Sequence, residues 1–298
     1  MSPRRGDDGL SDPSTKNGRL QRALLDLLKE HKRDCAIPTN GRFLFYELEQ
    51  RGLIPKHYAP GKKRTPAQDV TYALTVLRET GLVPWNWITD ETREVSDWQR
   101  AGSVFQYAMD AARSARISPW GDDEPPLLIC EARSVKAVLE DLASEYLVPI
   151  TATGGQCGGF LVTDVAPLLY GTRRVAYIGD FELRGPADQI EANTKRVLEH
   201  HSARDFDDEC AWERIALTEK QVNASKRLRE SAITKLDNRN KPAKRYEAVE
   251  CEAIGQSTLV KLARRWLEKQ LPEPLEDVLA REEEQREEVA ALLEEHAL

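Results

Sequence analysis

The sequence predicts an α/β protein of two domains, because hydrophobic residues follow different patterns in its two halves. In the first half, three short segments carry apolar residues at helical spacing before a short apolar run, which is typical of a winged helix. In the second half, continuously apolar runs alternate with amphipathic segments, which indicates a parallel sheet covered by helices on both faces. The predicted divisions are a disordered tail at 1–18, a winged-helix domain at 19–120, an α/β domain at 121–271 and an acidic C-terminal helix at 272–298.

Three helices are expected in the winged-helix domain. The first begins at Leu20, where leucines recur every three or four residues. The second covers 39–51 and the third covers 66–80, and each is followed by a glycine of the kind that ends helices. The run at 83–88 is expected to form the wing strand.

The α/β domain is expected after a linker at 118–126, which is rich in proline, glycine and acidic residues. Its expected strands and helices, in chain order, are 127–131, 134–146, 148–153, 160–170, 174–179, 186–200, 212–217 and 257–270. The last segment is expected to be one exposed helix whose acidic face is solvated and whose leucines could cover a partner helix.

The composition is that of an ordinary soluble protein, with 40% hydrophobic and 31% charged residues among 298. We find no run of the roughly 20 apolar residues that a membrane span needs, and no apolar segment typical of a signal peptide. The five cysteines form no CxxC pair and are expected to be reduced thiols. The histidines show no zinc-ligand spacing. A cytoplasmic protein is expected, without a membrane partner.

The net charge of −7 is concentrated at the C-terminus. Residues 272–298 carry ten acidic residues and two arginines, a net charge of −8, so the remaining chain is nearly neutral at +1. Two basic clusters in that remainder are either solvated loops or phosphate-binding surfaces. The candidate DNA contacts are Lys62, Lys63, Arg64, Arg239, Lys241, Lys244 and Arg245.

Three acidic residues follow two of the predicted strands. Glu131 ends the apolar run 127–130, and Asp180 and Glu182 follow the run 175–179. Ligands of open α/β sheets bind outside the carboxyl ends of the strands, so these acids can share one cation. Magnesium is usually held by one or two carboxylates together with substrate phosphates. The alternative is that Asp180 caps the next helix and Glu182 lies in solvent.

The order of these features resembles a Toprim domain, the metal-binding module of topoisomerases, primases and OLD-type nucleases. Glu131 on the first strand, the turn Gly154-Gly155 after the second, and the turn with Asp180 and Glu182 after the third carry the resemblance. It implies that the three acids bind Mg²⁺ for phosphodiester chemistry.

The predicted second helix carries another resemblance. The segment 39–46, with Arg42, Phe45 and Tyr46, looks like the Arg-x-x-(Tyr/Phe)-Tyr segment of the CAP-like winged helix in the A subunit of type IIB topoisomerases (topoisomerase VI) and its meiotic recombination relatives. The compact chain is similar to the short, phage-type mini-A versions of that family. The resemblance implies that Tyr46 is the nucleophile.

The residues of this helix are compatible with that role. Arg42 and Tyr46 lie four residues apart and fall together on a face distinct from the apolar one. We therefore expect Tyr46 to face a substrate and Arg42 to hold the scissile phosphate. The alternative is a half-buried tyrosine whose hydroxyl meets water.

The expected function is magnesium-dependent cleavage and rejoining of double-stranded DNA by a homodimer associated with the nucleoid. Tyr46 would form a phosphotyrosyl link, and the resemblance implies that it works with the metal of the other protomer. A separate ATPase subunit is a further expected partner. Two alternatives stay open: a Toprim nuclease in which metal-activated water attacks, and a DNA-binding or scaffold protein without catalysis. The second is favoured by Glu182, where the family usually has Asp.

Overall fold

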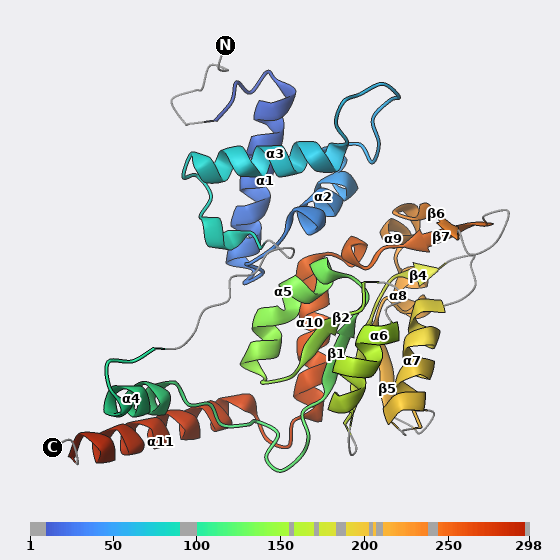
Figure 1. The fold of residues 1–298 in the computed structure, drawn as a ribbon. Coiled ribbons are helices and arrows are strands. Elements are labelled where there is room, and N and C mark those ends of the chain that lie inside the picture. Colours follow the sequence, from blue (N-terminus) through green and yellow to red (C-terminus); the bar gives the residue numbers. More distant parts are fainter. Residues whose placement is uncertain are drawn as a thin grey trace.

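The computed structural model describes residues 10–89, 100–154, 158–169, 173–182, 189–202, 205–206, 211–237 and 244–295. The structure is mixed α/β with a four-stranded parallel sheet, which confirms the prediction of an α/β protein with a parallel sheet. Figure 1 shows the first three helices above the sheet domain, and a two-helix arm that extends from the lower part of that domain.

Three helices form the N-terminal domain. They are α1 (Lys16–Arg33), α2 (Gly41–Gln50) and α3 (Pro66–Glu79). Each begins at a threonine or asparagine whose side chain accepts hydrogen bonds from backbone amides of the first turn, which satisfies donors that the helix itself leaves open. Their apolar faces meet in one buried cluster.

The ordered chain begins earlier than predicted. Leu10 is buried in the cluster between the helices, and the amide of Ser11 donates to Gln21 Oε1 at 2.8 Å. The prediction of a disordered tail up to residue 18 is therefore wrong for residues 10–18, because an apolar anchor holds them against α1. Residues 1–9 lie outside the described residues.

The predicted wing strand at 83–88 is also wrong. Trp85–Trp87 form a 3-10 turn (η1), and Ile88 makes an isolated parallel β-bridge with Thr39. The amide of Thr39 donates to the Trp87 carbonyl at 2.9 Å, so this segment pairs with the loop before α2. Residues 90–99 lie outside the described residues.

The parallel sheet has the strand order β2-β1-β3-β5. Its strands are β1 (Leu127–Cys130), β2 (Ile150–Ala152), β3 (Val175–Ile178) and β5 (Trp212–Ala216). The two central strands, β1 and β3, are buried along their whole length because helices cover both faces of the sheet.

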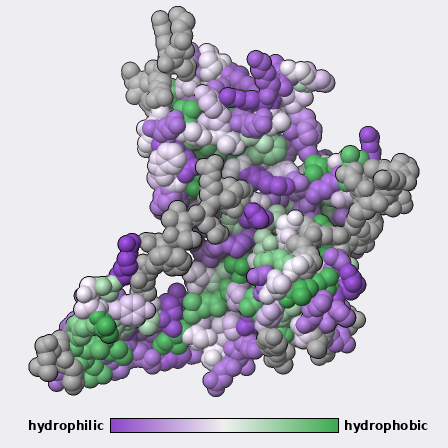
Figure 2. All heavy atoms as spheres, in the orientation of Figure 1, coloured by the Kyte–Doolittle hydropathy of each residue, from purple (hydrophilic) through white to green (hydrophobic). Residues whose placement is uncertain are grey.

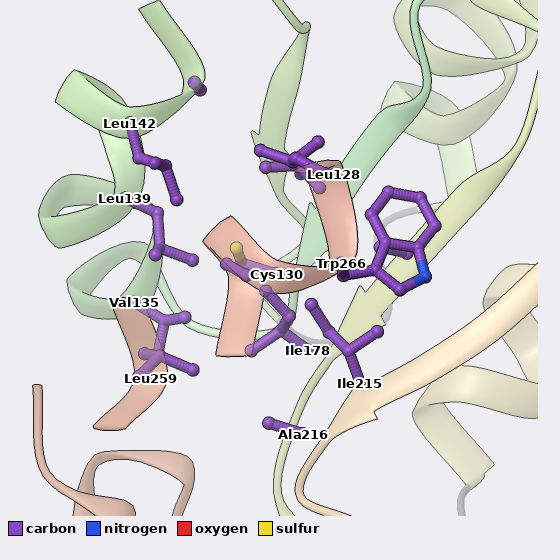
Figure 3. Packing of buried hydrophobic residues seen from close by; sticks show 14 of the residues in the cluster. Leu128, Cys130, Val135, Leu139, Leu142, Ile178, Ile215, Ala216, Leu259 and Trp266 are labelled. Atoms are coloured by element: carbon purple, nitrogen blue, oxygen red, sulfur yellow. The ribbon is translucent and has the colours of Figure 1, made fainter. Parts of the chain in front are cut away.

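One face of the sheet packs against α5 (Arg133–Glu145) and α10 (Gln256–Gln270). Figure 3 shows Leu128, Cys130 and Ile178 of the sheet meeting side chains of these two helices. The match to the predicted strands and helices is close here, because continuous burial leaves a strong hydrophobic pattern in the sequence.

The other face packs against α7 (Gln189–Ser202) and a helical segment of mixed geometry. That segment was predicted as one helix at 160–170. It consists of α6 (Gly158–Phe160), a π-helical turn η2 (Leu161–Val165) and a 3-10 turn η3 (Ala166–Leu168). Pro167 lacks an amide hydrogen, which prevents a regular α-helix through this position.

A second, antiparallel sheet lies beside the first and was not predicted. It has the order β4-β7-β6, with β4 (Phe181–Glu182), β6 (Ile233–Asp237) and β7 (Lys244–Val249). Two short helices, α8 (Glu219–Ala224) and α9 (Lys226–Glu230), precede β6. A 3-10 turn, η4 (Cys251–Ile254), leads from β7 into α10.

The arm consists of α4 (Val104–Ser114) and the expected C-terminal helix α11 (Leu275–Glu295), which pack against each other. Figure 2 shows apolar side chains gathered on the visible face of the arm. Glu282 departs from the expected solvated acidic face, since it is buried and pairs with Arg116 at 3.2 Å and Arg286 at 2.7 Å. Among the described residues, none of the helices has both the length and the apolar character that a bilayer crossing requires.

The predicted domain boundary at residue 120 is displaced. Residues of α4 pack on α11, and Trp120 is buried in the cluster of the sheet domain, where its Nε1 donates to the Tyr146 carbonyl at 2.8 Å. The segment from residue 104 to residue 120 therefore belongs with the second half of the chain, because its apolar side chains find their partners there.

The N-terminal domain is fixed to the sheet domain through the start of α2. Phe43 is fully buried, and it belongs to the hydrophobic cluster of the sheet domain. Gln256 Nε2 donates to the carbonyls of Ala36 at 2.9 Å and Pro38 at 2.6 Å. Gln50 Nε2 donates to the Ala253 carbonyl at 2.6 Å. This docking brings α2 to the end of the parallel sheet.

Candidate functional site

Glu131 lies at the carboxyl end of β1. Its amide donates to the Ile178 carbonyl of β3 at 2.8 Å, which continues the pairing of the two strands. Its Oε2 accepts a hydrogen bond from the amide of Asp180 at 3.1 Å. The side chain therefore reaches across the sheet end toward the turn after β3.

Gly179 provides the space for this approach. A Cβ at that position would lie 2.8 Å from Glu131 Oε2 and 2.7 Å from Tyr177 Cε1, both too close for ordinary contact. A residue without a side chain is thus needed where the Glu131 carboxylate crosses β3.

Asp180 follows Gly179 and is held by two donors. Its Oδ1 accepts from the amide of Cys251 at 2.9 Å, and its Oδ2 forms an ion pair with Lys235 Nζ of β6. Glu131 and Asp180, called the carboxylate pair below, lie together at the strand ends as the sequence predicts.

The two carboxylates repel each other in a half-buried site. Burial and the neighbouring charge of Asp180 together raise the pKa of Glu131 from 4.5 to about 7. Burial alone would lower the pKa of the Lys235 ammonium group, but the attraction of Asp180 outweighs burial and raises that pKa. The site therefore gathers negative charge that a cation would relieve.

Two further glutamates that the sequence analysis missed complete the acidic region. Glu252 is fully buried and pairs with Arg42 Nε at 2.7 Å, and Glu250 pairs with Arg42 Nη2 at 2.8 Å. Glu250 also lies 3.7 Å from Lys235. The pattern Glu250-Cys251-Glu252 repeats the acid-x-acid spacing of Asp180 and Glu182, which is the signal that could have identified it.

Glu182, the third predicted ligand, follows Asp180 by two residues. It lies on β4, where it pairs with Ala248 of β7. The described residues contain no cluster of three or more His, Cys, Asp or Glu arranged to hold a metal ion. The three-acid magnesium site thus stays a prediction, of which two members lie together.

Tyr46 does not lie where the sequence analysis places it. Its exposed fraction is 6%, and its ring meets Phe45 edge-on, with centroids 5.1 Å apart, inside the cluster of the N-terminal domain. The expectation that it faces a substrate is wrong, because side chains of α1 and α3 in the same cluster enclose it. Arg42 points instead to Glu250 and Glu252.

The predicted DNA contacts that the structure describes lie at two places. Lys62, Lys63 and Arg64 are exposed before α3, and the Arg64 guanidinium lies 4.4 Å from the ring centroid of Tyr72. Lys244 and Arg245 lie on β7. Arg239 and Lys241 lie outside the described residues.

Comparison of the chain with models of known protein families, with curated proteins and with solved structures gave no match. The site is therefore interpreted from its own geometry.

The carboxylate oxygens of Glu131 and Asp180 are of the type that binds a hard divalent cation. Carboxylate oxygens are the ligands that Mg²⁺ prefers, and two of them suffice when water and phosphate complete the shell. Lys235 already places a positive charge beside Asp180 Oδ2, so a metal ion at this carboxylate would compete with the ammonium group. Glu131 and Asp180 are the residues that would hold it.

Replacing Glu131 with Gln is expected to change how stability depends on pH. Folding raises the pKa of Glu131, so the folded state holds this proton more tightly, and stability falls as pH rises from 4.5 to about 7. At full ionisation the penalty is on the order of 3 kcal/mol, since one pKa unit corresponds to about 1.4 kcal/mol. Urea unfolding in EDTA across this range should show a flatter profile for Glu131→Gln than for wild type. Parallel profiles would contradict the assignment.

Proposed function

We propose that the protein cleaves the backbone of double-stranded DNA with Mg²⁺. We further propose that its two domains are a three-helix domain of the winged-helix type, in which 83–88 do not form the wing strand, and a Toprim-type domain. The observation that carries the proposal is the carboxylate pair at the strand ends together with two neighbouring cations. Lys235 pairs with Asp180, and Glu250 links Lys235 to Arg42. Acids suited to a hard cation and bases suited to phosphate are the combination that phosphodiester chemistry needs.

The residues have separate tasks in this proposal. Glu131 and Asp180 hold the magnesium ion, which supplies positive charge to the attacked phosphate and the leaving oxygen. Arg42 donates to phosphate oxygens, and Lys235 offsets negative charge beside Asp180. The DNA backbone is bound further out by the exposed basic residues Lys62, Lys63, Arg64 and Arg245.

The burial of Tyr46 supports water as the nucleophile. Its side chain is almost fully buried and its ring lies among apolar side chains of the N-terminal domain, which leaves little room for a phosphate. Glu131 and Asp180, in contrast, are half-buried, so water can approach the carboxylate pair. A metal-dependent nuclease is therefore the leading form of the proposal.

Tyrosine transesterification by a homodimer is the second candidate. It is favoured by the position of α2, because the helix that carries Tyr46 also carries Arg42, whose guanidinium lies at the acidic region. The sequence resemblance points the same way. This candidate requires that α2 rearranges and that the tyrosine meets the metal site of a second protomer.

Replacing Tyr46 with Phe separates the two candidates. The nuclease form expects nicking of supercoiled plasmid in magnesium at close to the wild-type rate, with a stability loss of at most about 1 kcal/mol from the lost hydroxyl. Denaturing electrophoresis of end-labelled DNA should show no label travelling with either protein.

The opposite result would favour tyrosine transesterification. Label that travels with wild type but not with Tyr46→Phe would establish the tyrosine as nucleophile. EDTA added before the DNA is the control for metal dependence in both cases. DNA binding without cleavage under any of these conditions would contradict the enzymatic proposal.

A further inference from the structure

Four polar side chains form a connected network where α2 meets the sheet domain. Asn40 caps α2 through Oδ1 and donates from Nδ2 to the Ser134 carbonyl of α5 at 2.9 Å. The Ser134 hydroxyl donates to Glu252 Oε1 at 2.5 Å, and Arg42 Nε lies 2.7 Å from the same oxygen. These residues, Asn40, Arg42, Ser134 and Glu252, are called the positioning network below.

The network fixes the direction of the Arg42 guanidinium. Glu252 is completely inaccessible to solvent, and burial raises the pKa of its carboxyl despite the opposing charge of Arg42. A buried ion pair adds little net stability, because desolvation of both groups offsets their attraction. Its main consequence is geometric. Asn40, which caps α2, and Glu252, which pairs with the Arg42 guanidinium, both hydrogen-bond to Ser134 of α5.

Arg42 keeps donors for another partner. A guanidinium has five N–H groups in a planar fork, and the two ion pairs use Nε and Nη2. The Arg42 side chain is still 44% exposed, in contrast to Glu252 at 0%. Part of the Arg42 side chain therefore stays open to solvent at the end of the sheet.

Arg42 is also connected to the carboxylate pair. Glu250 lies between two cations, at 2.8 Å from Arg42 Nη2 and 3.7 Å from Lys235 Nζ, and Lys235 pairs with Asp180. The positive charges and the carboxylates therefore alternate along one edge of the site. A DNA phosphate bound near Asp180 would meet the exposed side of the Arg42 fork.

We propose that Arg42 is a DNA-phosphate contact of the site formed by Glu131 and Asp180, and that Glu252 is the residue that positions it. Ser134 and Asn40 fix Glu252 and the start of α2 relative to each other. The site is then assembled from both domains of one protomer, and Arg42 acts there rather than beside Tyr46. This inference rests on the proposed DNA cleavage.

The test compares Arg42→Gln, Glu252→Gln, the double variant and Glu247→Gln in the full-length chain. Glu247 is an exposed glutamate on the same strand, β7. Its replacement removes the same charge as Glu252→Gln, so the pair separates positioning from general electrostatics. Binding of a fluorescent DNA duplex is measured in EDTA over a range of salt, and plasmid nicking is measured in magnesium.

Loss of a phosphate contact has a specific signature. Arg42→Gln should lower the slope of log affinity against log salt by about 1. Glu252→Gln should bind more weakly than Glu247→Gln and nick with kcat/KM lowered about tenfold, the scale of one charge-assisted hydrogen bond. The double variant should be no worse than Arg42→Gln alone, because both changes remove the same contact.

Several results would overturn the inference. They are an unchanged salt slope in Arg42→Gln, equal binding by Glu252→Gln and Glu247→Gln, or additive losses in the double variant. Thermal melts identify a Glu252→Gln protein that fails to fold, and the salt slope of Arg42→Gln then decides alone. Wild type that binds DNA but does not nick it removes the proposed cleavage only, whereas wild type that does not bind DNA removes both.

Discussion

Replacing Asp180 with Asn is expected to lower the rate of magnesium-dependent DNA nicking by at least about 100-fold, since loss of even an outer partner of a metal ligand costs about 10- to 100-fold. The amide oxygen can still accept from the Cys251 amide, so the turn after β3 should keep its shape. The negative charge that balances Lys235 and attracts the cation is lost. Plasmid nicking at several magnesium concentrations measures the effect.

Asp141→Asn is the matched control, because Asp141 is an exposed aspartate of α5. It should nick at the wild-type rate. Calorimetry should show weaker magnesium binding for Asp180→Asn and unchanged binding for the control. Equal nicking by both variants would mean that the cation, if one is used, lies elsewhere.

Replacing Gly179 with Ala is expected to damage both stability and activity. The new Cβ would overlap Tyr177, which is fully buried, and the carboxylate of Glu131. Overpacking of this kind costs about 1 to 3 kcal/mol. Glu131 must also turn away from the Asp180 amide, which separates the carboxylate pair and should reduce nicking about as strongly as Asp180→Asn.

Gly102→Ala is the control for this substitution, because an added Cβ there meets nothing within 4 Å. Urea unfolding should place Gly102→Ala near wild type and Gly179→Ala well below it. A Gly179→Ala protein that unfolds and nicks like wild type would show that Glu131 can leave its place without consequence.

The meeting of Glu131 and Asp180 was predictable from the sequence for a simple reason. Both follow continuously apolar runs, and parallel strands bring their carboxyl ends to one edge. Glu250 and Glu252 could not be placed in the same way. They enter through the turn between β7 and α10, and the antiparallel pairing of β7 with β4 and β6 leaves a weak pattern in short, half-exposed strands.

The error on Tyr46 has a different origin. Helical periodicity separates the faces of α2, but it does not say how many neighbours the helix has. Side chains of α1 and α3 cover the face that the pattern marks as free, and six of the ten residues of α2 are buried. Information of that kind is contained in the packing of α2 against α1 and α3, which the periodicity of α2 alone does not describe.

Phe43 limits how far the two domains can swing apart. Its ring belongs to the N-terminal chain segment but fills a place in the interior of the other domain. Drawing it into water costs about 2 to 3 kcal/mol, which on its own would hold a hinged-apart form to roughly one molecule in a hundred. A nucleic acid that has to reach the far side of α2 must therefore bind the rarely populated hinged-apart form more tightly than the docked form.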